Sequence, residues 1–172
     1  MTTQVELAKL ELAWSSEGTN NLSTQSIDAT DLALIQLLQL DGRRPYTQLA
    51  KEVGLSEAAV RQRVQRMLEQ QAMQIVAVTD PMQLGLKRQA MVLIKVDGDV
   101  RAVADQLEKI EEVDYLVVTA GAVDLLCEVV VSDDDALFSL LNDKIRSIQG
   151  VASTETIMYL GLRKQTYQWG TR

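Results

Sequence analysis

Hydrophobic residues recur every three or four positions in three consecutive segments of the first half of the chain. This spacing predicts helices over residues 28–40, 45–53 and 57–68. Gly54 can supply a left-handed turn between the last two, and Ser56 is a typical cap for the third. Two helices joined so closely form a helix-turn-helix. The apolar residues that define the pattern are Leu32, Leu34, Ile35, Leu38, Leu49, Ala50, Val53, Val60, Val64, Met67 and Leu68.

The residues that flank these helices agree with the same prediction. Asp28 and Asp31 lie where the dipole of the first helix favours acids, and Asp41-Gly42 follows its last turn. Pro45 suits the first position of the second helix. The run Met73–Thr79 is strand-like, so we expect either the wing of a winged helix or the first strand of a linker.

From Gln89 onward the hydrophobic pattern alternates between the periods of strands and helices. It predicts the order strand, helix, strand, strand, helix, strand, which is that of a ferredoxin-like domain. Helices cover one face of such a sheet, so a second copy is the simplest cover for the other face, and a symmetric dimer follows. The predicted strands are 90–96, 115–120, 125–131 and 151–160, and the predicted helices are 100–110 and 132–148.

Composition excludes several classes of function. The chain has no histidine, which rules out histidine-based metal sites, catalytic triads and pH switches. Cys127 lies in an apolar run and is expected to be a buried structural thiol. No nucleophile lies beside a base, so we expect neither an enzyme nor a cofactor. No apolar run reaches the roughly 18 residues of a membrane span, and no signal peptide is recognisable, so a cytoplasmic protein is expected.

The net charge of −7 is distributed unevenly along the chain. Residues 43–66 hold six basic and two acidic side chains, whereas the chain from residue 89 onward holds eight basic and fourteen acidic ones. A basic patch on an otherwise acidic protein indicates a polyanionic partner at that patch. Because the patch coincides with the helix-turn-helix, we expect double-stranded DNA to be that partner.

The chain from about Ile27 to Gly170 resembles the Lrp/AsnC (leucine-responsive, or feast/famine) regulators. The resemblance implies an α+β protein with an N-terminal winged helix-turn-helix and a C-terminal βαββαβ, ferredoxin-like domain for ligand sensing and dimerisation. It also implies an amino-acid effector and homodimers that commonly assemble into octamers. The segments that carry it, in order, are IDATDLALIQLLQLDGR, QLAKEVGLSEAAVRQRVQR, VAVTDPMQLG, VVTAGAVDLLCEVVV, GVASTETIMYL and RKQTYQWG.

The sequence departs from the family pattern at three positions. The family usually ends its recognition helix at a glycine, where this chain has Gln71, so we expect the helix to run on or to end in a strained cap. Pro45 replaces a capping serine, which is a tolerated change. Val123 replaces an aromatic residue of the sensor turn, a change expected to alter or abolish ligand binding.

Candidate DNA contacts come from the third helix and from the loop before the second. The N-terminal end and outer face of a recognition helix reach base edges, which selects Ser56, Ala58, Arg61 and Gln62. Phosphate contacts need a cation that positions the protein without reading sequence, which selects Arg43, Arg44, Arg63 and Arg66. An ion pair with Asp28 or Asp31 is an alternative role for Arg63, and a solvated basic surface is the alternative for the whole set.

Candidate effector contacts lie in the turn formed by Thr119, Gly121, Ala122 and Asp124. The resemblance implies that Asp124 accepts an amino acid's ammonium group, that the turn's amides donate to its carboxylate, and that the pocket lies between subunits. The alternative is a hairpin turn in which glycine permits positive φ and aspartate bonds the local backbone.

Three other features have plainer explanations. Asp133–Asp135 begin a predicted helix, whose dipole accounts for them without a metal. Residues 1–26 are expected to be a disordered tail, or alternatively to dock on a partner subunit through Leu7, Leu10 and Trp14. Packing in the last strand and tail is expected for Tyr159, Tyr167 and Trp169.

Together these features predict a sequence-specific DNA-binding transcriptional regulator that an amino acid or related small effector modulates. The alternatives are an architectural DNA-binding protein without a ligand, and a protein-interaction module whose ferredoxin-like domain binds a small molecule or is a small enzyme. The expected divisions are an extension over 1–26, the helix-turn-helix domain over 27–74, a linker strand or wing over 75–88, the ferredoxin-like domain over 89–162 and a tail over 163–172.

Overall fold

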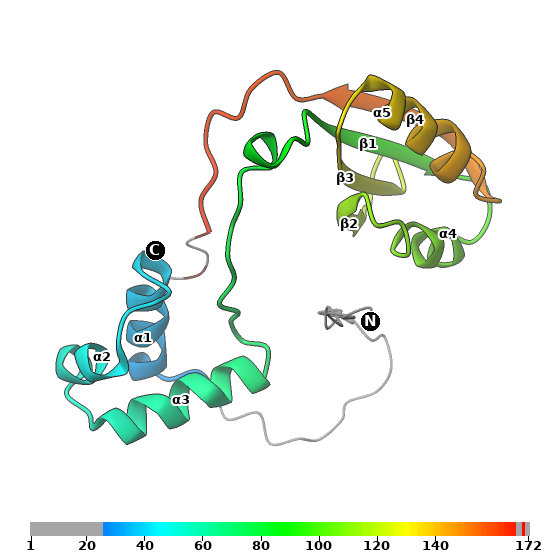
Figure 1. Ribbon diagram of the computed structural model, residues 1–172. Helices are drawn as coiled ribbons and strands as arrows, with labels where there is room; N and C mark the ends of the chain where they lie inside the picture. The colour runs from blue at the N-terminus through cyan, green and yellow to red at the C-terminus, as the bar shows by residue number, and fades with distance from the viewer. Residues whose placement is uncertain (1–25, 168–169, 171–172) are drawn as a thin grey trace, which may run out of the picture. The chain divides into compact units, whose positions relative to one another are not determined.

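The computed structural model describes residues 26–167 and Gly170 (Figure 1). The predictions for the N-terminal extension, apart from residue 26, and for Trp169 lie outside the described residues. The chain divides into two compact units. Of the described residues, the first unit contains 26–75 and Gly170, and the second contains Val76–Tyr167.

The first unit is a bundle of helices α1 (Ala29–Leu40), α2 (Tyr46–Val53) and α3 (Glu57–Glu69), which confirms the predicted helix-turn-helix. Two details differ from the prediction. Pro45 is the N-cap of α2 in an extended conformation and not its first helical residue. Leu32 is 42% exposed, because α1 turns Leu34 and Leu38 toward the core instead. The buried apolar residues are Leu34, Leu38, Leu49, Ala50, Val60, Val64 and Met67.

The end of α3 has a strained cap, which is one of the two alternatives predicted from the missing glycine; the helix does not run on. Gln71 adopts φ 54°, and no other non-glycine residue of the described chain has a positive φ. The amide of Gln71 donates to the carbonyl of Leu68, and that of Ala72 donates to the carbonyl of Met67. This is the Schellman arrangement, which normally places glycine at the left-handed position. A side chain there costs about 1–2 kcal/mol.

The strand expected over Met73–Thr79 is absent, which corrects that prediction. No residue of the described chain forms a strand ladder with this segment, and Ile75, Val76 and Val78 are exposed. β-branched residues favour a strand only where a neighbouring strand can pair with them. A short 3₁₀ turn, η1 (Pro81–Leu84), follows.

The second unit is an antiparallel sheet with helices on one face, which confirms the ferredoxin-like prediction (Figure 1). Among the described residues the four strands lie in the order β2-β3-β1-β4. The elements are β1 (Arg88–Val96), α4 (Val100–Leu107), β2 (Val113–Val118), β3 (Leu125–Val131), α5 (Asp134–Ser139) and β4 (Val151–Met158).

Helix α5 continues into a π-helical turn over Leu140–Ile145, a change of hydrogen bonding that periodicity does not predict. Side chains from α4, α5 and the π-turn pack on one face of β1 and β3. Cys127 is buried in this core as predicted, and burial raises the pKa of its thiol to about 11. In the described residues, no helix is long and apolar enough to span a bilayer.

Replacing Gln71 with glycine should stabilise the first unit. The change relieves the left-handed strain but also loosens the unfolded chain, so we expect a net gain of about 0.5–1 kcal/mol in the free energy of unfolding. Urea denaturation followed by circular dichroism measures it. Gln70→Gly is the matched control, because Gln70 has φ −81° and glycine there should destabilise the unit. Equal effects of the two substitutions would contradict a strained cap.

Candidate nucleic-acid interface and effector turn

The connection between α2 and α3 has the geometry of a helix-turn-helix. Gly54 ends α2 in a left-handed conformation with φ 70°, as predicted. The hydroxyl of Ser56 then caps α3 by accepting a hydrogen bond from the Ala59 amide at 3.2 Å, also as predicted. Val60 and Val64 anchor one side of α3 in the core. The opposite side of α3 is therefore held outward by a fixed turn and a packed inner face.

The four residues predicted to contact base edges lie together on this outward surface. Ser56 and Ala58 are exposed at the N-terminal end of α3, and Arg61 and Gln62 are exposed one turn further on. The arrangement presents three hydrogen-bonding side chains and one methyl group, that of Ala58, at the helix end that enters a groove in helix-turn-helix proteins.

Arg61 is held from two sides. Its Nη2 donates to Oε1 of Glu57 at 2.8 Å, one turn earlier in α3. Its guanidinium carbon lies 4.9 Å from the centre of the Tyr46 ring. Sequence reasoning missed Tyr46, because nothing in the local pattern of α2 indicates which side chain of the next helix its ring will meet.

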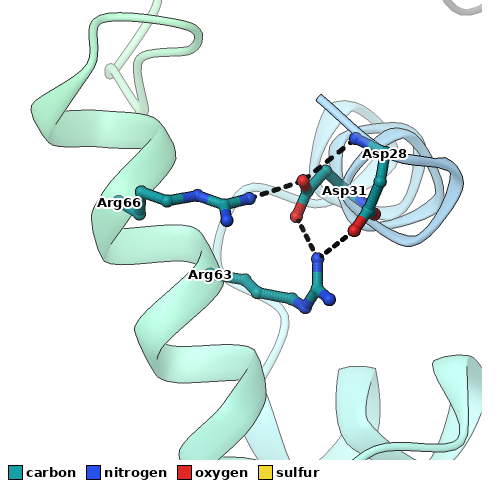
Figure 2. Close-up of polar contacts among 4 residues, drawn as sticks. All are labelled: Asp28, Asp31, Arg63 and Arg66. Carbon is teal, nitrogen blue, oxygen red and sulfur yellow. Dashed lines mark hydrogen bonds and ion pairs between the residues drawn. The ribbon is translucent and has the colours of Figure 1, made fainter. Parts of the chain in front are cut away.

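Arg63 and Arg66 turn back toward α1, where they bind two acidic residues (Figure 2). Nη1 of Arg63 contacts Asp28 at 2.7 Å and Asp31 at 2.9 Å, so the predicted alternative role of Arg63 is confirmed. Nη2 of Arg66 contacts the other carboxylate oxygen of Asp31 at 2.5 Å. Asp31 is completely buried, a position that helix-dipole reasoning did not predict.

Asp28 and Asp31 also bind the first turn of α1. Asp28 accepts from the Asp31 amide at 2.9 Å, and Asp31 accepts from the Asp28 amide at 3.2 Å, which forms a reciprocal capping box. The hydrogen bond from Arg63 is the main cause that lowers the pKa of Asp28 below its ordinary value of 3.8. A lowered folded pKa means that the contact stabilises the fold above about pH 4 and that this stabilisation is lost as pH falls through the folded pKa.

The two arginines before α2 lie in different surroundings. Arg43 is exposed, and its backbone amide donates to Asp41 at 2.9 Å. Arg44 is more enclosed, with a side chain 19% exposed and an ion pair to Glu52 at 2.9 Å. A phosphate near Arg44 would therefore meet a cation that already has a carboxylate partner.

The predicted effector turn, which connects β2 to β3, is held against β1 by hydrogen bonds of Asp124. Val96 donates its amide to Oδ2 of Asp124 at 2.9 Å, and Asp124 donates its own amide to the Ile94 carbonyl at 3.0 Å. Thr119 donates its hydroxyl to the Val123 carbonyl at 2.6 Å. Gly121 and Ala122, which lie between Thr119 and Val123 in the sequence, are exposed. Asp124 thus bonds backbone as the plainer alternative predicted, but Gly121 does not use a positive φ.

The acidic run at the start of α5 also has structural partners. Asp133 caps the helix by accepting from the Ala136 amide at 2.8 Å, and Asp134 forms an ion pair with Arg88. Within the described residues, no group of three or more histidine, cysteine or acidic side chains has the arrangement of a metal site.

Comparison with known proteins relates both units to one group of regulators. A family model described as the AsnC-type helix-turn-helix domain matches residues 27–68, and one described as the Lrp/AsnC ligand-binding domain matches residues 89–169. An uncharacterised HTH-type transcriptional regulator of Pyrococcus furiosus is 34% identical over 143 residues, which cover 82% of this chain and 97% of the relative.

Solved structures give the same relation. AsnC of E. coli aligns with a TM-score of 0.75 at 27% identity, covering 83% of this chain and 97% of that one. A feast or famine regulatory protein of M. tuberculosis, solved as a complex with L-methionine, aligns with a TM-score of 0.74 at 30% identity. That alignment covers 81% of this chain and 96% of the relative.

Replacing Asp31 with alanine should destabilise the first unit strongly, because it leaves Arg63 and Arg66 facing each other without the carboxylate between them. We expect a loss of about 2–4 kcal/mol, below the range for fully buried pairs since both arginines keep some water contact. Thermal and urea unfolding measure the loss. Asp105→Ala, on the exposed side of α4, is the matched control and should change stability by less than about 0.5 kcal/mol. Similar small effects of both substitutions would refute the structural role of Asp31.

Proposed function

We propose that this chain, which belongs to the Lrp/AsnC family of helix-turn-helix transcriptional regulators, reads DNA sequence with α3 and that an amino acid controls its binding to DNA. The observation that supports it best is the outward face of α3, where a capped helix end presents Ser56, Ala58, Arg61 and Gln62 together. Helix α3 enters the major groove, and its exposed N-terminal half meets base edges. An arginine there suits the O6 and N7 atoms of guanine, and a glutamine suits adenine.

Phosphate contacts come from the arginines that surround this face. Arg43 and Arg44 lie just before α2, and Arg63 and Arg66 lie on the flank of α3. Arg63 uses one guanidinium nitrogen for its ion pairs with both aspartates. A guanidinium has five N–H donors, so Arg63 can bind a phosphate while it keeps those ion pairs. The same residue then both holds α3 and positions DNA.

A homodimer is the assembly that best accounts for the uncovered face of the sheet. Side chains opposite the helix layer include Met91, Leu93 and Leu126, and the exposed Tyr115 and Ile157 lie on that same face by strand register. An apolar sheet face needs a cover, and a two-fold related copy supplies one. The dimer presents two recognition helices to half-sites spaced by whole turns of DNA, roughly 34–36 Å. We propose further that these dimers assemble into octamers.

An amino acid is the effector that the second unit suits. The family's ligand-binding domain matches here, and a relative from M. tuberculosis was solved with L-methionine. In the proposed site, Asp124 accepts from the ammonium group, and the amides of the exposed Gly121 and Ala122 donate to the carboxylate. Thr119 and Val123 shape the turn. Since coupling is reciprocal, the amino acid changes DNA affinity by the same factor by which DNA changes affinity for the amino acid.

The test measures affinity of the full-length protein for its own upstream DNA and for random DNA of equal length, at two salt concentrations, with and without a mixture of amino acids. Preferential, salt-dependent binding that shifts with the mixture supports the proposal. Preference without any effect of amino acids would refute the effector alone. Weak preference together with no effect of amino acids would favour an architectural protein. Absence of binding to either DNA at low salt would refute DNA recognition and favour the protein-interaction module.

Arg61→Ala should weaken binding to the preferred DNA and relax sequence preference at one base pair, because a base-edge contact is lost. We expect a cost of about 1–3 kcal/mol on that DNA and much less on random DNA. Fluorescence anisotropy with single-base operator variants measures both. Arg101→Ala, an exposed arginine on α4, removes the same charge elsewhere and should leave preference unchanged. An equal loss on both kinds of DNA would eliminate the base-reading role.

Gly121→Ala should weaken effector binding while leaving the stability of the fold unchanged. The new methyl group would meet no heavy atom within 4 Å, and Gly121 does not need positive φ, so stability should change by less than about 0.5 kcal/mol. A ligand held by the turn's amides would meet that methyl group, so the amino-acid response of DNA binding should fall. Calorimetry with L-methionine and the DNA assay measure the two effects. An unchanged response of DNA binding to amino acids would show that the effector does not bind at this turn.

A further inference from the structure

Tyr46 stands at the junction between the core of the first unit and its DNA-facing surface. It is the first residue of α2, and it is half-buried and packed against the core that α1, α2 and α3 share. Its ring also lies beside Arg61 of α3, whose guanidinium carbon is 4.9 Å from the ring centre. The ring is therefore fixed by packing on one side and meets a cation on the other.

Arg61 itself is mostly exposed, with 62% of its side chain accessible. A long, exposed arginine normally samples many rotamers and loses that freedom when it binds. Here Tyr46 and Glu57 restrict it before any ligand arrives, and they do so differently. Glu57 occupies one N–H donor at 2.8 Å and brings a negative charge that a phosphate or a base acceptor must compete with.

The aromatic ring restricts Arg61 without occupying its donors. A cation over an aromatic face is held through the π cloud, and the N–H groups of the guanidinium point outward in its own plane. Those in-plane donors form the fork that binds the O6 and N7 atoms of guanine. An arginine held over a ring is thus ordered and still able to read a base.

We propose that Tyr46 is a positioning residue for sequence recognition. It orders the Arg61 guanidinium for a base edge, so a residue of α2 outside the recognition helix sets preference at the base pair that Arg61 reads. This inference rests on the proposed DNA recognition by α3 and adds a second residue to that site.

The experiment compares Tyr46→Phe, which keeps the ring, with Tyr46→Leu, which keeps apolar packing but has no π face. Binding to the preferred upstream DNA should stay within about twofold of wild type for Tyr46→Phe and should fall roughly three- to tenfold for Tyr46→Leu. Affinity for random DNA should not change. With single-base operator variants, Tyr46→Leu should lose preference at the same base pair as Arg61→Ala.

A double-mutant cycle makes the test specific. In an Arg61→Ala background, Tyr46→Leu should cost no further affinity, because the group that it positions is gone. Phe138→Leu is the matched control, since Phe138 is an exposed aromatic residue of α5 in the other unit. Melting temperatures of all variants check folding, and Tyr46→Met replaces the leucine variant if that one does not fold at the assay temperature.

The possible outcomes distinguish this inference from the function on which it rests. A wild type that prefers its upstream DNA, with a Tyr46→Leu variant that keeps this preference, would overturn the role of Tyr46 alone. Equal losses on preferred and random DNA, or losses additive with Arg61→Ala, would overturn it as well. A wild type with no preference at all would overturn both the role of Tyr46 and the proposed reading of bases by α3.

Discussion

The buried carboxylate of Asp31 is the interaction on which the arrangement of the first unit depends. It comes from the first turn of α1, yet it accepts hydrogen bonds from two arginines of α3 and from the backbone amide of Asp28, the N-cap of α1. A buried carboxylate is unfavourable unless its oxygens are satisfied, and here both oxygens have partners. The requirement to satisfy it restricts the distance and rotation of α3 relative to α1.

This constraint separates the basic residues of α3 into two groups that a linear sequence does not distinguish. Arg63 and Arg66 face the acidic residues of α1, so they join the helices. Arg61 faces outward, and in the described chain it contacts Glu57 of α3 and the ring of Tyr46 at the start of α2. Because only the inner arginines join two helices, replacing Arg61 should disturb the fold less than replacing Arg63 or Arg66. A recognition surface built in this way can acquire new sequence preferences on a stable support.

Local patterns predicted those elements that depend on neighbours along the chain. Gly54 and Ser56 determine the turn through their own conformation and side chain. Strands β1 and β3 follow from short, nearly continuous apolar runs that pair within the same unit. The strained cap at Gln71 was one of two predicted alternatives, and it could be named in advance because a left-handed cap is a property of one residue.

The failures concern positions whose environment depends on distant partners. Met73–Thr79 has the composition of a strand but no pairing strand in the described chain. The burial of Asp31 depends on arginines that lie far along the sequence, and the contact of Tyr46 with Arg61 depends on how two helices cross. The π-turn after α5 likewise changes hydrogen bonding without changing the apolar pattern.

The ion pairs of the first unit also bear on how this protein responds to the ionic atmosphere of DNA. Each phosphate neutralised by a protein cation releases condensed counterions, and log K falls by about 0.9 for each such contact per tenfold rise in salt. Arg44, Arg61, Arg63 and Arg66 all carry carboxylate partners before DNA arrives. Their carboxylates already act as intramolecular counterions, so the basic patch attracts a polyanion less than its number of arginines implies. Indiscriminate attraction to any DNA is thereby reduced, and geometric fit to a particular base sequence carries a larger share of the binding.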